Sequence, residues 1–353
     1  MDASNDSDLA EALQGRGELL ACLRLFCIRR RGHLLLALPR DAAAARATLG
    51  LYHPQAHLAR VLIWVVRILV RFRLHPLLPK IELTVRDKSP LASMLDKPDS
   101  LGFLLGNPES ASRRAVIVYR ENDQLLVDKL GFRGAARESV LRELEHIKAL
   151  PQGNAALPAV VSEDTGEQWA SYATRYLNGK SPRKADDGKV LGVLKNWLEN
   201  SQPALLSATG QWREMADHAA SHDVGNLWKR LGKAADNQVQ VGVFHGDFAP
   251  WNIKVSPDGS VHVMDWESGC PHGPAGWDWL HYMIQRATLV DHHGVAKVLD
   301  DCRRWANTST GKAFLDAAGW GAHVEGWLGS YLMHSSWIGG FERQDLLAEW
   351  MQV

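Results

Sequence analysis

One stretch of the chain reads His245-Gly246-Asp247-Phe248-Ala249-Pro250-Trp251-Asn252, and Asp265-Trp266-Glu267 follows after a short apolar segment. The pattern is H-x-D-x-x-x-x-N followed by D-W-E. Phosphoryl transfer from a nucleotide needs a carboxylate that takes the proton of the acceptor hydroxyl. It also needs an amide oxygen and a second carboxylate that hold Mg²⁺ on the phosphates. We therefore assign Asp247 as the base, and Asn252 and Asp265 as the metal ligands.

The segments on either side of this loop have the pattern of short strands. Val239, Val241 and Val243 alternate with polar or small residues and predict a strand that leads to His245. Two apolar runs, 253–255 and 261–264, flank a turn signal that contains Pro-Asp-Gly. A hairpin here would bring Asp265 back beside Asn252.

These residues resemble the aminoglycoside phosphotransferase and choline kinase family, whose catalytic loop reads H-G-D-x-x-x-x-N and whose metal motif reads I/M-D-W/F-E/D. Protein kinases differ, because they have Arg between the His and the Asp and have D-F-G. The resemblance covers roughly residues 100–285. It implies an α+β, two-lobed protein-kinase-like fold, with a small mixed β/α lobe and a mainly helical large lobe. It also implies Mg²⁺, ATP or GTP as phosphoryl donor, and the hydroxyl of a small molecule as acceptor.

Three residues of the catalytic segment are expected to support the others: His245, Glu267 and Asp278. Asp278 follows a Gly-Pro loop and opens a helix, which it could cap. In the family that the chain resembles, the aspartate at this place ties the helix to the catalytic loop by hydrogen bonds.

A kinase-like small lobe also needs a lysine on a strand and a glutamate on the following helix, because this ion pair positions the nucleotide phosphates. Arg114–Arg120 and Gln124–Leu130 predict two strands, and Lys129 lies in the second. The stripe of apolar residues over 135–150 predicts a helix that carries Glu143. Each residue alone reads as an ordinary surface charge, but their order before the catalytic loop favours the ion pair.

The loop expected to cover the phosphates lies within 102–112 and is not G-x-G-x-x-G. Ser110 and Ser112 could donate hydrogen bonds to phosphate oxygens. The run Trp169–Leu177 predicts the last strand of the small lobe, and we expect backbone groups near Thr174 and Tyr176 to contact the nucleotide base.

Two other functions fit some of these residues. His245, Asp247, His262 and Asp265 could bind Zn²⁺ or Mn²⁺ in a metal-dependent hydrolase, but this leaves Asn252 and the lysine without a role. A nucleotide-binding scaffold without turnover is the second alternative, and the intact set of site residues argues against it.

Composition is typical of a globular intracellular enzyme. With 353 residues, of which 46% are hydrophobic, the chain can form two cores. We divide it into a basic, helical N-terminal extension (1–90), a small nucleotide-binding lobe (91–177) and a large catalytic and acceptor-binding lobe (178–353). The four cysteines form no C-x-x-C motif, and the N-terminus lacks the cationic start of a secretory signal. We therefore expect a cytoplasmic protein.

The net charge of zero conceals an uneven distribution. Residues 15–80 contain 12 Lys and Arg against 2 Asp and Glu. The remaining residues therefore contain 28 Lys and Arg against 38 Asp and Glu. This basic part includes the apolar stretch 58–74, in which Arg60, Arg67 and Arg71 share one helical face. We expect this helix to pack on the small lobe; peripheral docking on the inner membrane surface is the alternative. No motif for nucleic acid is present, so we expect no nucleic-acid partner.

The acceptor is less well defined by the sequence. An aminoglycoside pocket should be strongly acidic, whereas the acidic residues of the C-terminal region form no obvious cluster: Asp300, Asp301, Glu325, Glu342, Asp345 and Glu349. We therefore favour a sugar or another hydroxylated metabolite, such as a glycan precursor.

Overall fold

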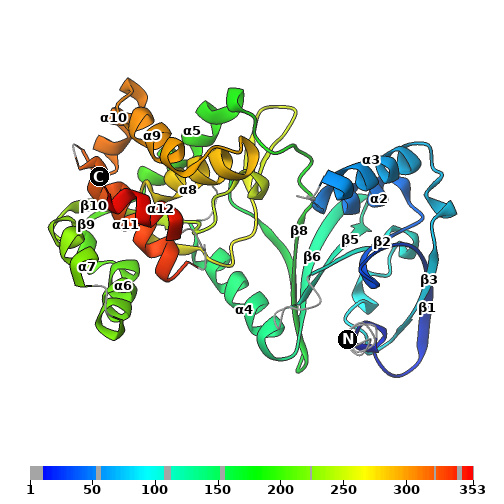
Figure 1. Ribbon diagram of the computed structural model, residues 1–353. Coiled ribbons are helices and arrows are strands. Elements are labelled where there is room, and N and C mark those ends of the chain that lie inside the picture. Colours follow the sequence, from blue (N-terminus) through cyan, green and yellow to red (C-terminus); the bar gives the residue numbers. More distant parts are fainter. Residues whose placement is uncertain are drawn as a thin grey trace. The chain divides into compact units, whose positions relative to one another are not determined.

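The computed structural model describes residues 11–52, 57–106, 113–151, 156–222, 225–321, 323–339 and 344–352. The chain forms two compact units (Figure 1). The first comprises Met1–Glu145 and Pro158–Asn178, and the second comprises His146–Leu157 and Gly179–Val353.

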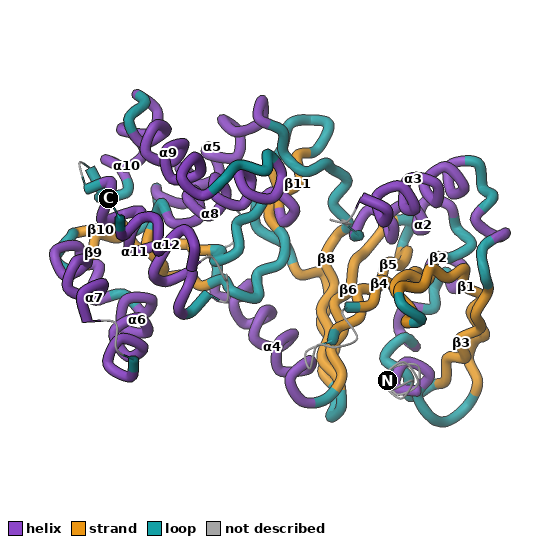
Figure 2. The backbone as a smooth tube through the Cα atoms, viewed as in Figure 1, coloured by secondary structure: helices purple, strands orange, loops and turns teal. Residues whose placement is uncertain are grey.

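The first unit is built on an eight-stranded antiparallel sheet in the order β3-β1-β2-β4-β5-β6-β8-β7 (Figure 2). Its strands are β1 (Leu19–Arg30), β2 (His33–Leu38), β3 (Lys80–Arg86), β4 (Gly102–Leu105), β5 (Arg114–Glu121), β6 (Gln124–Phe132), β7 (Val160–Thr165) and β8 (Trp169–Arg175). Strands β5, β6 and β8 lie where the sequence predicts them.

The N-terminal segment is not the helical extension that the sequence analysis expects. Its strands β1, β2 and β3 continue the same sheet as β4–β8, and no division between compact units falls at residue 90. Part of the physical reason lies in the second half of β1, which is covered on both faces: Leu25 belongs to one core cluster, and Phe26 and Ile28 to another. A strand buried on both faces has a continuous apolar run instead of a clear alternation, so its period is hard to recognise.

The helices of this unit include α2 (Ala42–Leu51), α3 (His57–Arg71) and most of α4 (Gly134–Ala149). Helix α2 begins at Asp41, whose side chain accepts a hydrogen bond from the Ala44 N–H (2.7 Å). Helix α3 packs on the sheet through Ile63, Val66 and Val70. The predicted packing of this segment on the small lobe therefore holds for one face of the helix.

The second unit is mainly helical, as expected. Its strands form one three-stranded sheet, in the order β13-β10-β9, and one hairpin, β11-β12. Their bounds are β9 (Gln202–Leu205), β10 (Gln238–Phe244), β11 (Ile253–Val255), β12 (Val261–Val263) and β13 (Cys270–Pro274). Its helices are α5 (Asp187–Leu198), α6 (Gly210–Ser221), α7 (Gly225–Leu231), α8 (Trp277–Gln285), α9 (Val295–Ala306), α10 (Ser309–Ala317), α11 (Val324–Trp337) and α12 (Gln344–Met351).

Among the described residues, no helix combines the length and the apolar character needed to cross a bilayer.

Candidate active site

The catalytic loop starts where β10 ends and is held by one buried carboxylate. The Asp278 carboxylate accepts hydrogen bonds from the backbone N–H groups of His245 (2.8 Å) and Gly246 (3.1 Å). Gly246 has φ +78°, and a Cβ at this position would lie 2.5 Å from the Ser268 carbonyl oxygen. The loop can therefore turn at this point only with a glycine.

His245 fixes the shape of the loop as a neutral imidazole. Its Nε2 lies 2.8 Å from the Met264 carbonyl oxygen, and its Nδ1 accepts from the Asp247 N–H (3.2 Å). Complete burial lowers the pKa of His245, although the Met264 carbonyl and nearby carboxylates act in the opposite direction. The proton therefore sits on Nε2. Because both ring nitrogens are engaged within the loop, the structure disagrees with the hydrolase alternative, which needs His245 as a metal ligand.

Asp247 is held through both of its carboxylate oxygens. The Asn252 side-chain N–H donates to Oδ2 (2.8 Å), and His281 Nε2 lies 2.9 Å from Oδ1. The same Asn252 amide also donates to the Asp247 carbonyl oxygen (2.9 Å). The loop thus presents a carboxylate whose orientation is determined from two sides.

His281 and Tyr331 are site residues that the sequence analysis missed. His281 lies on α8, one turn after Asp278, and is buried. Its Nδ1 lies 2.7 Å from the hydroxyl of Tyr331 on α11, and burial raises the pKa of Tyr331 above its usual value. Because an ionised carboxylate can only accept, His281 donates through Nε2–H to Asp247. The only signal for His281 in the sequence was its position three residues after Asp278 on the same predicted helix. Tyr331 had no local signal, because it lies fifty residues further along the chain.

This environment keeps Asp247 ionised. Burial by itself would raise the pKa of Asp247, but the opposing effects, of which the hydrogen bond from His281 is the largest, more than offset it, so that the pKa is lowered. A carboxylate in this state can accept a proton from a hydroxyl group at neutral pH.

The predicted hairpin brings the two expected metal ligands together. Strands β11 and β12 pair in register from Ile253–Val263 to Val255–Val261, and the Met264 N–H donates to the Asn252 carbonyl oxygen (2.8 Å). Asp265 then adopts φ +67°, a left-handed conformation that is strained for a residue with a side chain. Because the Asn252 amide nitrogen contacts Asp247, its oxygen is the atom left for a cation. The donors are thus an amide oxygen and carboxylates, which is the set that Mg²⁺ prefers.

In the first unit, the predicted ion pair is present. Lys129 Nζ lies 2.6 Å from Glu143 Oε1, and the Glu143 side chain is fully buried. Arg114, which the sequence analysis did not single out, lies 3.5 Å from the other carboxylate oxygen. Two cations therefore face Glu143, and the carboxylate holds the lysine in place by charge as well as by hydrogen bonding.

The remaining predicted residues have mixed outcomes. Thr174 on β8 pairs in register with Val127 on β6 and Val160 on β7, and the Tyr176 N–H donates to Leu125 (2.9 Å). Sheet pairing therefore already uses the Tyr176 N–H that was expected near the base. Glu267 is exposed on the turn after Trp266. Ser110 and Ser112 lie outside the described residues.

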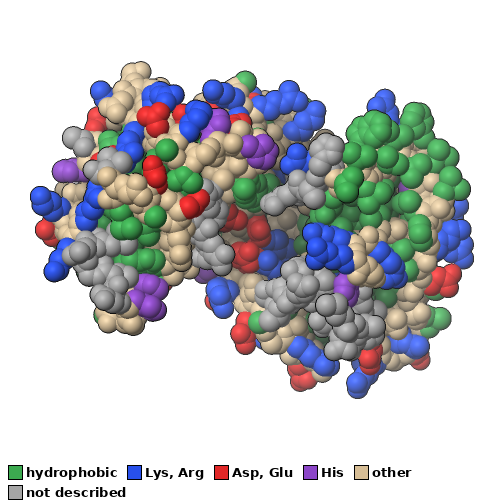
Figure 3. Space-filling view, viewed as in Figure 1, with side chains coloured by type: hydrophobic (Ala, Val, Ile, Leu, Met, Phe, Trp, Pro, Cys, Tyr) green, Lys and Arg blue, Asp and Glu red, His purple; other side chains and the backbone are tan. Residues whose placement is uncertain are grey.

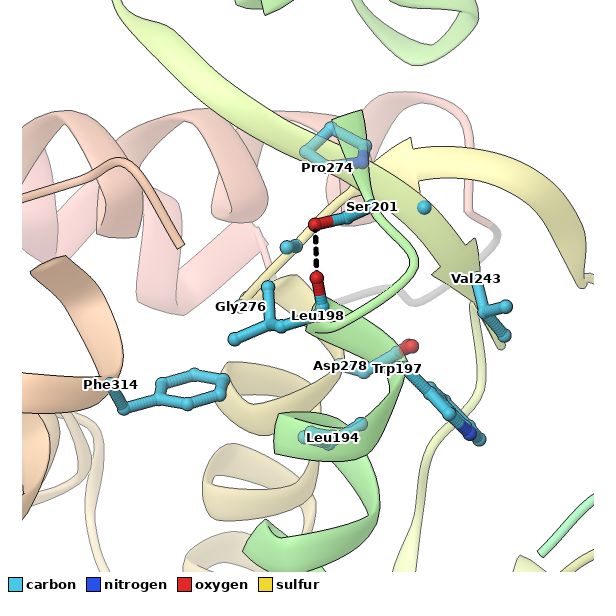
Figure 4. A pocket seen from close by; sticks show the side chains of 11 residues that line it. Leu194, Trp197, Leu198, Ser201, Val243, Pro274, Gly276, Asp278 and Phe314 are labelled. Atoms are coloured by element: carbon cyan, nitrogen blue, oxygen red, sulfur yellow. Dashed lines mark hydrogen bonds between the residues drawn. The ribbon is translucent and has the colours of Figure 1, made fainter. Parts of the chain in front are cut away.

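Asp278 does not cap α8, because the N-cap residue is Gly276 and Asp278 is the second residue of the helix. It instead turns its carboxylate to the catalytic loop, and complete burial raises its pKa to about 7 against the effect of the two N–H donors. Asp278 also lines a small pocket between α5, β10 and β13 (Figure 4). Tying the loop to the helix is thus the role that the geometry supports.

Comparison with solved structures gives several kinases that act on small molecules. An aminoglycoside-3'-phosphotransferase of type VIII is 20% identical, with a TM-score of 0.44 over 67% of this chain and 94% of that chain. The choline kinase LicA from Streptococcus pneumoniae is 14% identical, with a TM-score of 0.41 over 67% and 86%. The aminoglycoside phosphotransferase APH(4)-Ia with ADP and hygromycin B is 13% identical, with a TM-score of 0.45 over 71% and 90%. A search of curated proteins gave no match.

A family model described as the phosphotransferase enzyme family matches residues 105–286, which is more than half of the 353 residues. The match runs from β4 to the end of α8 and thus includes the ion pair, the catalytic loop and Asp278. The kinase-like α+β fold expected from the sequence is confirmed. The chain belongs to the phosphotransferase enzyme family.

Proposed function

We propose that this protein transfers the γ-phosphoryl group of ATP or GTP to a hydroxyl group of a small molecule. The observation that carries the proposal is the Asp247 carboxylate, which is fixed by Asn252 and His281 and has a lowered pKa. Both oxygens of this carboxylate accept hydrogen bonds that orient it, but the Asp247 side chain is still 39% exposed, so a hydroxyl group can reach it. The buried carboxylate of Asp278 has no such access, and Asp247 is therefore the better candidate for a general base.

In the proposed reaction, the acceptor oxygen attacks the γ-phosphorus and its proton passes to the Asp247 carboxylate. The bond between the γ-phosphorus and the bridging oxygen breaks, and the nucleoside diphosphate leaves with the bonding electrons. Asn252 and Asp265 would hold Mg²⁺, which offsets phosphate charge when bound. Lys129, held by Glu143, would contact the phosphates of the nucleotide.

The charge pattern of the second unit favours a neutral acceptor over an aminoglycoside. Three of its C-terminal acidic residues are paired with local cations: Arg303 contacts Glu325 (2.7 Å), Lys297 contacts Asp301 (3.0 Å), and Arg304 pairs with Asp300. The charge of these carboxylates is therefore partly neutralised, and they attract a polycation only weakly. We propose a sugar or a glycan precursor as the acceptor class.

We also propose that the protein is cytoplasmic and contacts the inner membrane surface through residues 58–74.

Acceptor-dependent release of ADP or GDP tests this function. The panel should contain free sugars, sugar alcohols, lipid-linked sugars, choline and aminoglycosides, with the Asp247→Asn variant as the matched control. We expect release with a hydroxylated sugar for the unmodified protein and at least a hundredfold less for the variant. Nucleotide binding without release across the panel would instead favour a scaffold.

A further inference from the structure

Helix α3 has two apolar faces, of which only one is packed. Ile63, Val66 and Val70 are at most 2% exposed and belong to the core with β1, β2 and α2. A second arc of the helix is apolar as well but open to solvent, and it consists of Leu58, Val61, Leu62 and Val65. On this arc, Leu58 is 84% exposed.

The open arc continues past the end of the helix, where Phe72 (64%), Leu74 and Leu77 are exposed. Figure 3 shows apolar side chains gathered over the part of the molecule where Figure 1 places α3. Single exposed leucines are ordinary on a protein surface, but contiguous apolar patches mark an interaction site. We call the seven residues Leu58, Val61, Leu62, Val65, Phe72, Leu74 and Leu77 the α3 patch.

The charged residues of the segment that forms the α3 patch are all Arg or Lys. Arg60, Arg67 and Arg71 share the next arc of the helix with Trp64, which is 62% exposed, and Arg73 follows the helix. Residues 57–80 contain no Asp or Glu. An apolar arc, an adjoining row of arginines and an exposed tryptophan are the composition of helices that lie in a lipid interface, where apolar side chains enter the acyl boundary and arginines contact anionic head groups.

We infer that the α3 patch docks on an anionic lipid surface. The core face of α3 fixes the helix on the sheet, so the patch is preformed. A second copy of this chain fits less well, because a two-fold contact through the patch would bring the arginine rows of both copies to one interface, where like charges repel. This inference concerns the first unit only. It adds to the proposed function the surface at which the protein would act, and its biological meaning rests on that proposed function.

Sedimentation with lipid vesicles tests the inference without any activity measurement. The full chain is mixed with phosphatidylcholine vesicles or with vesicles that also contain phosphatidylglycerol. We expect binding to the second kind, weakened by salt. The variant Arg67→Glu/Arg71→Glu should reduce partitioning at least about thirtyfold, since each arginine near such a surface is worth roughly 1 kcal/mol.

The apolar contribution is tested separately with Leu62→Glu/Val65→Glu, which keeps every arginine and should also reduce partitioning at least about tenfold. Leu205→Glu is the matched apolar control, because Leu205 and Leu62 are 48% and 49% exposed, and Arg213→Glu/Lys229→Glu is the matched charge control. Both controls should bind vesicles like the unmodified protein. Circular dichroism and thermal unfolding identify any variant that has lost its fold.

Three outcomes would overturn the inference. The first is no sedimentation with anionic vesicles, and the second is an equal loss of binding in the control variants. The third is a dimer in analytical ultracentrifugation that Leu62→Glu/Val65→Glu converts to monomers, when neither the unmodified protein nor this variant binds vesicles. Because acceptor-dependent ADP release is measured without vesicles, failure of docking and failure of the proposed kinase activity are distinguishable.

Discussion

At the scale of single residues, Asp247 is the group on which the proposed chemistry depends. We expect Asp247→Asn to lower phosphoryl transfer by ~10²–10⁴, the usual loss for a general base, while Mg-nucleotide binding stays nearly intact. Single-turnover transfer and nucleotide titration measure the two effects. Turnover close to that of the unmodified protein would remove Asp247 from the role of base.

His281 is expected to act through Asp247 and not on the substrate. Its hydrogen bond lowers the pKa of Asp247, so His281→Leu should raise that pKa. Activity requires the ionised carboxylate and is lost as pH falls through its pKa. The acidic limb of the kcat/KM profile should therefore move to higher pH in the variant.

His334→Leu is the matched control for this experiment. His334 is a buried histidine on α11, whose pKa burial lowers to about 4, and it packs on Trp277. A change in packing alone would lower stability in both variants. A shift of the acidic limb in His281→Leu but not in His334→Leu identifies positioning, whereas an unchanged limb in both would exclude it.

Asp265 is expected to contribute to nucleotide binding only through the cation. Asp265→Ala should weaken ATP binding when Mg²⁺ is present and have little effect in EDTA, because the carboxylate is placed as a metal ligand. Isothermal titration in the two conditions measures the difference. An equal loss with and without Mg²⁺ would count against coordination by Asp265.

At the scale of elements, strand β6 carries both Lys129 and a buried acid that the chemistry does not use. Asp128 is 3% exposed, and burial raises its pKa from 3.8 to about 7 despite a hydrogen bond from Ser171. Its Oδ1 has no hydrogen-bond partner within the part of the chain that the structure describes. The folded state therefore holds a proton on Asp128 that the unfolded state releases.

The sign of the resulting pH dependence follows from proton linkage. Between pH 4 and pH 7 the folded state binds more protons at Asp128 than the unfolded state, so the free energy of unfolding falls as pH rises and then levels off. The Asp128→Asn variant lacks this titration. We expect it to gain up to a few kcal/mol over the unmodified protein at pH 8 and less at pH 4, as measured by urea unfolding. A pH-independent difference would show that Asp128 is not protonated in the fold.

At the scale of the whole molecule, the N-terminal third belongs to the first unit instead of being appended to it. Strand β2 pairs with β4, and Val85 and Leu25 share a core cluster with Phe103 and Ile117. Removal of residues 1–90 would uncover this cluster and leave β4 as an unprotected edge. We expect the shortened chain to be insoluble or to unfold several degrees lower, since burial contributes ~25 cal/mol per Å². A soluble, folded product with unchanged melting temperature would contradict this.

The sequence by itself determined the parts of this protein whose signals are local. H-G-D-x-x-x-x-N and D-W-E are separated by one short hairpin, and its pairing brings the segments of Asn252 and Asp265 together. Lys129 and Glu143 are fourteen residues apart, and their pairing was predicted from the order of a strand and the helix that follows it.

Tertiary structure decided what depends on distant contacts. The partners that fix Asp247 from α8 and α11 come from segments whose packing no local pattern encodes, so Tyr331 could not be found by spacing. In β1, burial of both faces over residues 25–28 weakens the alternation that marks a strand. Strand β3 does alternate, and this local signal was not used. The two apolar arcs of α3 read in sequence as one hydrophobic helix, and only the fold shows which arc the core covers and which remains open to solvent.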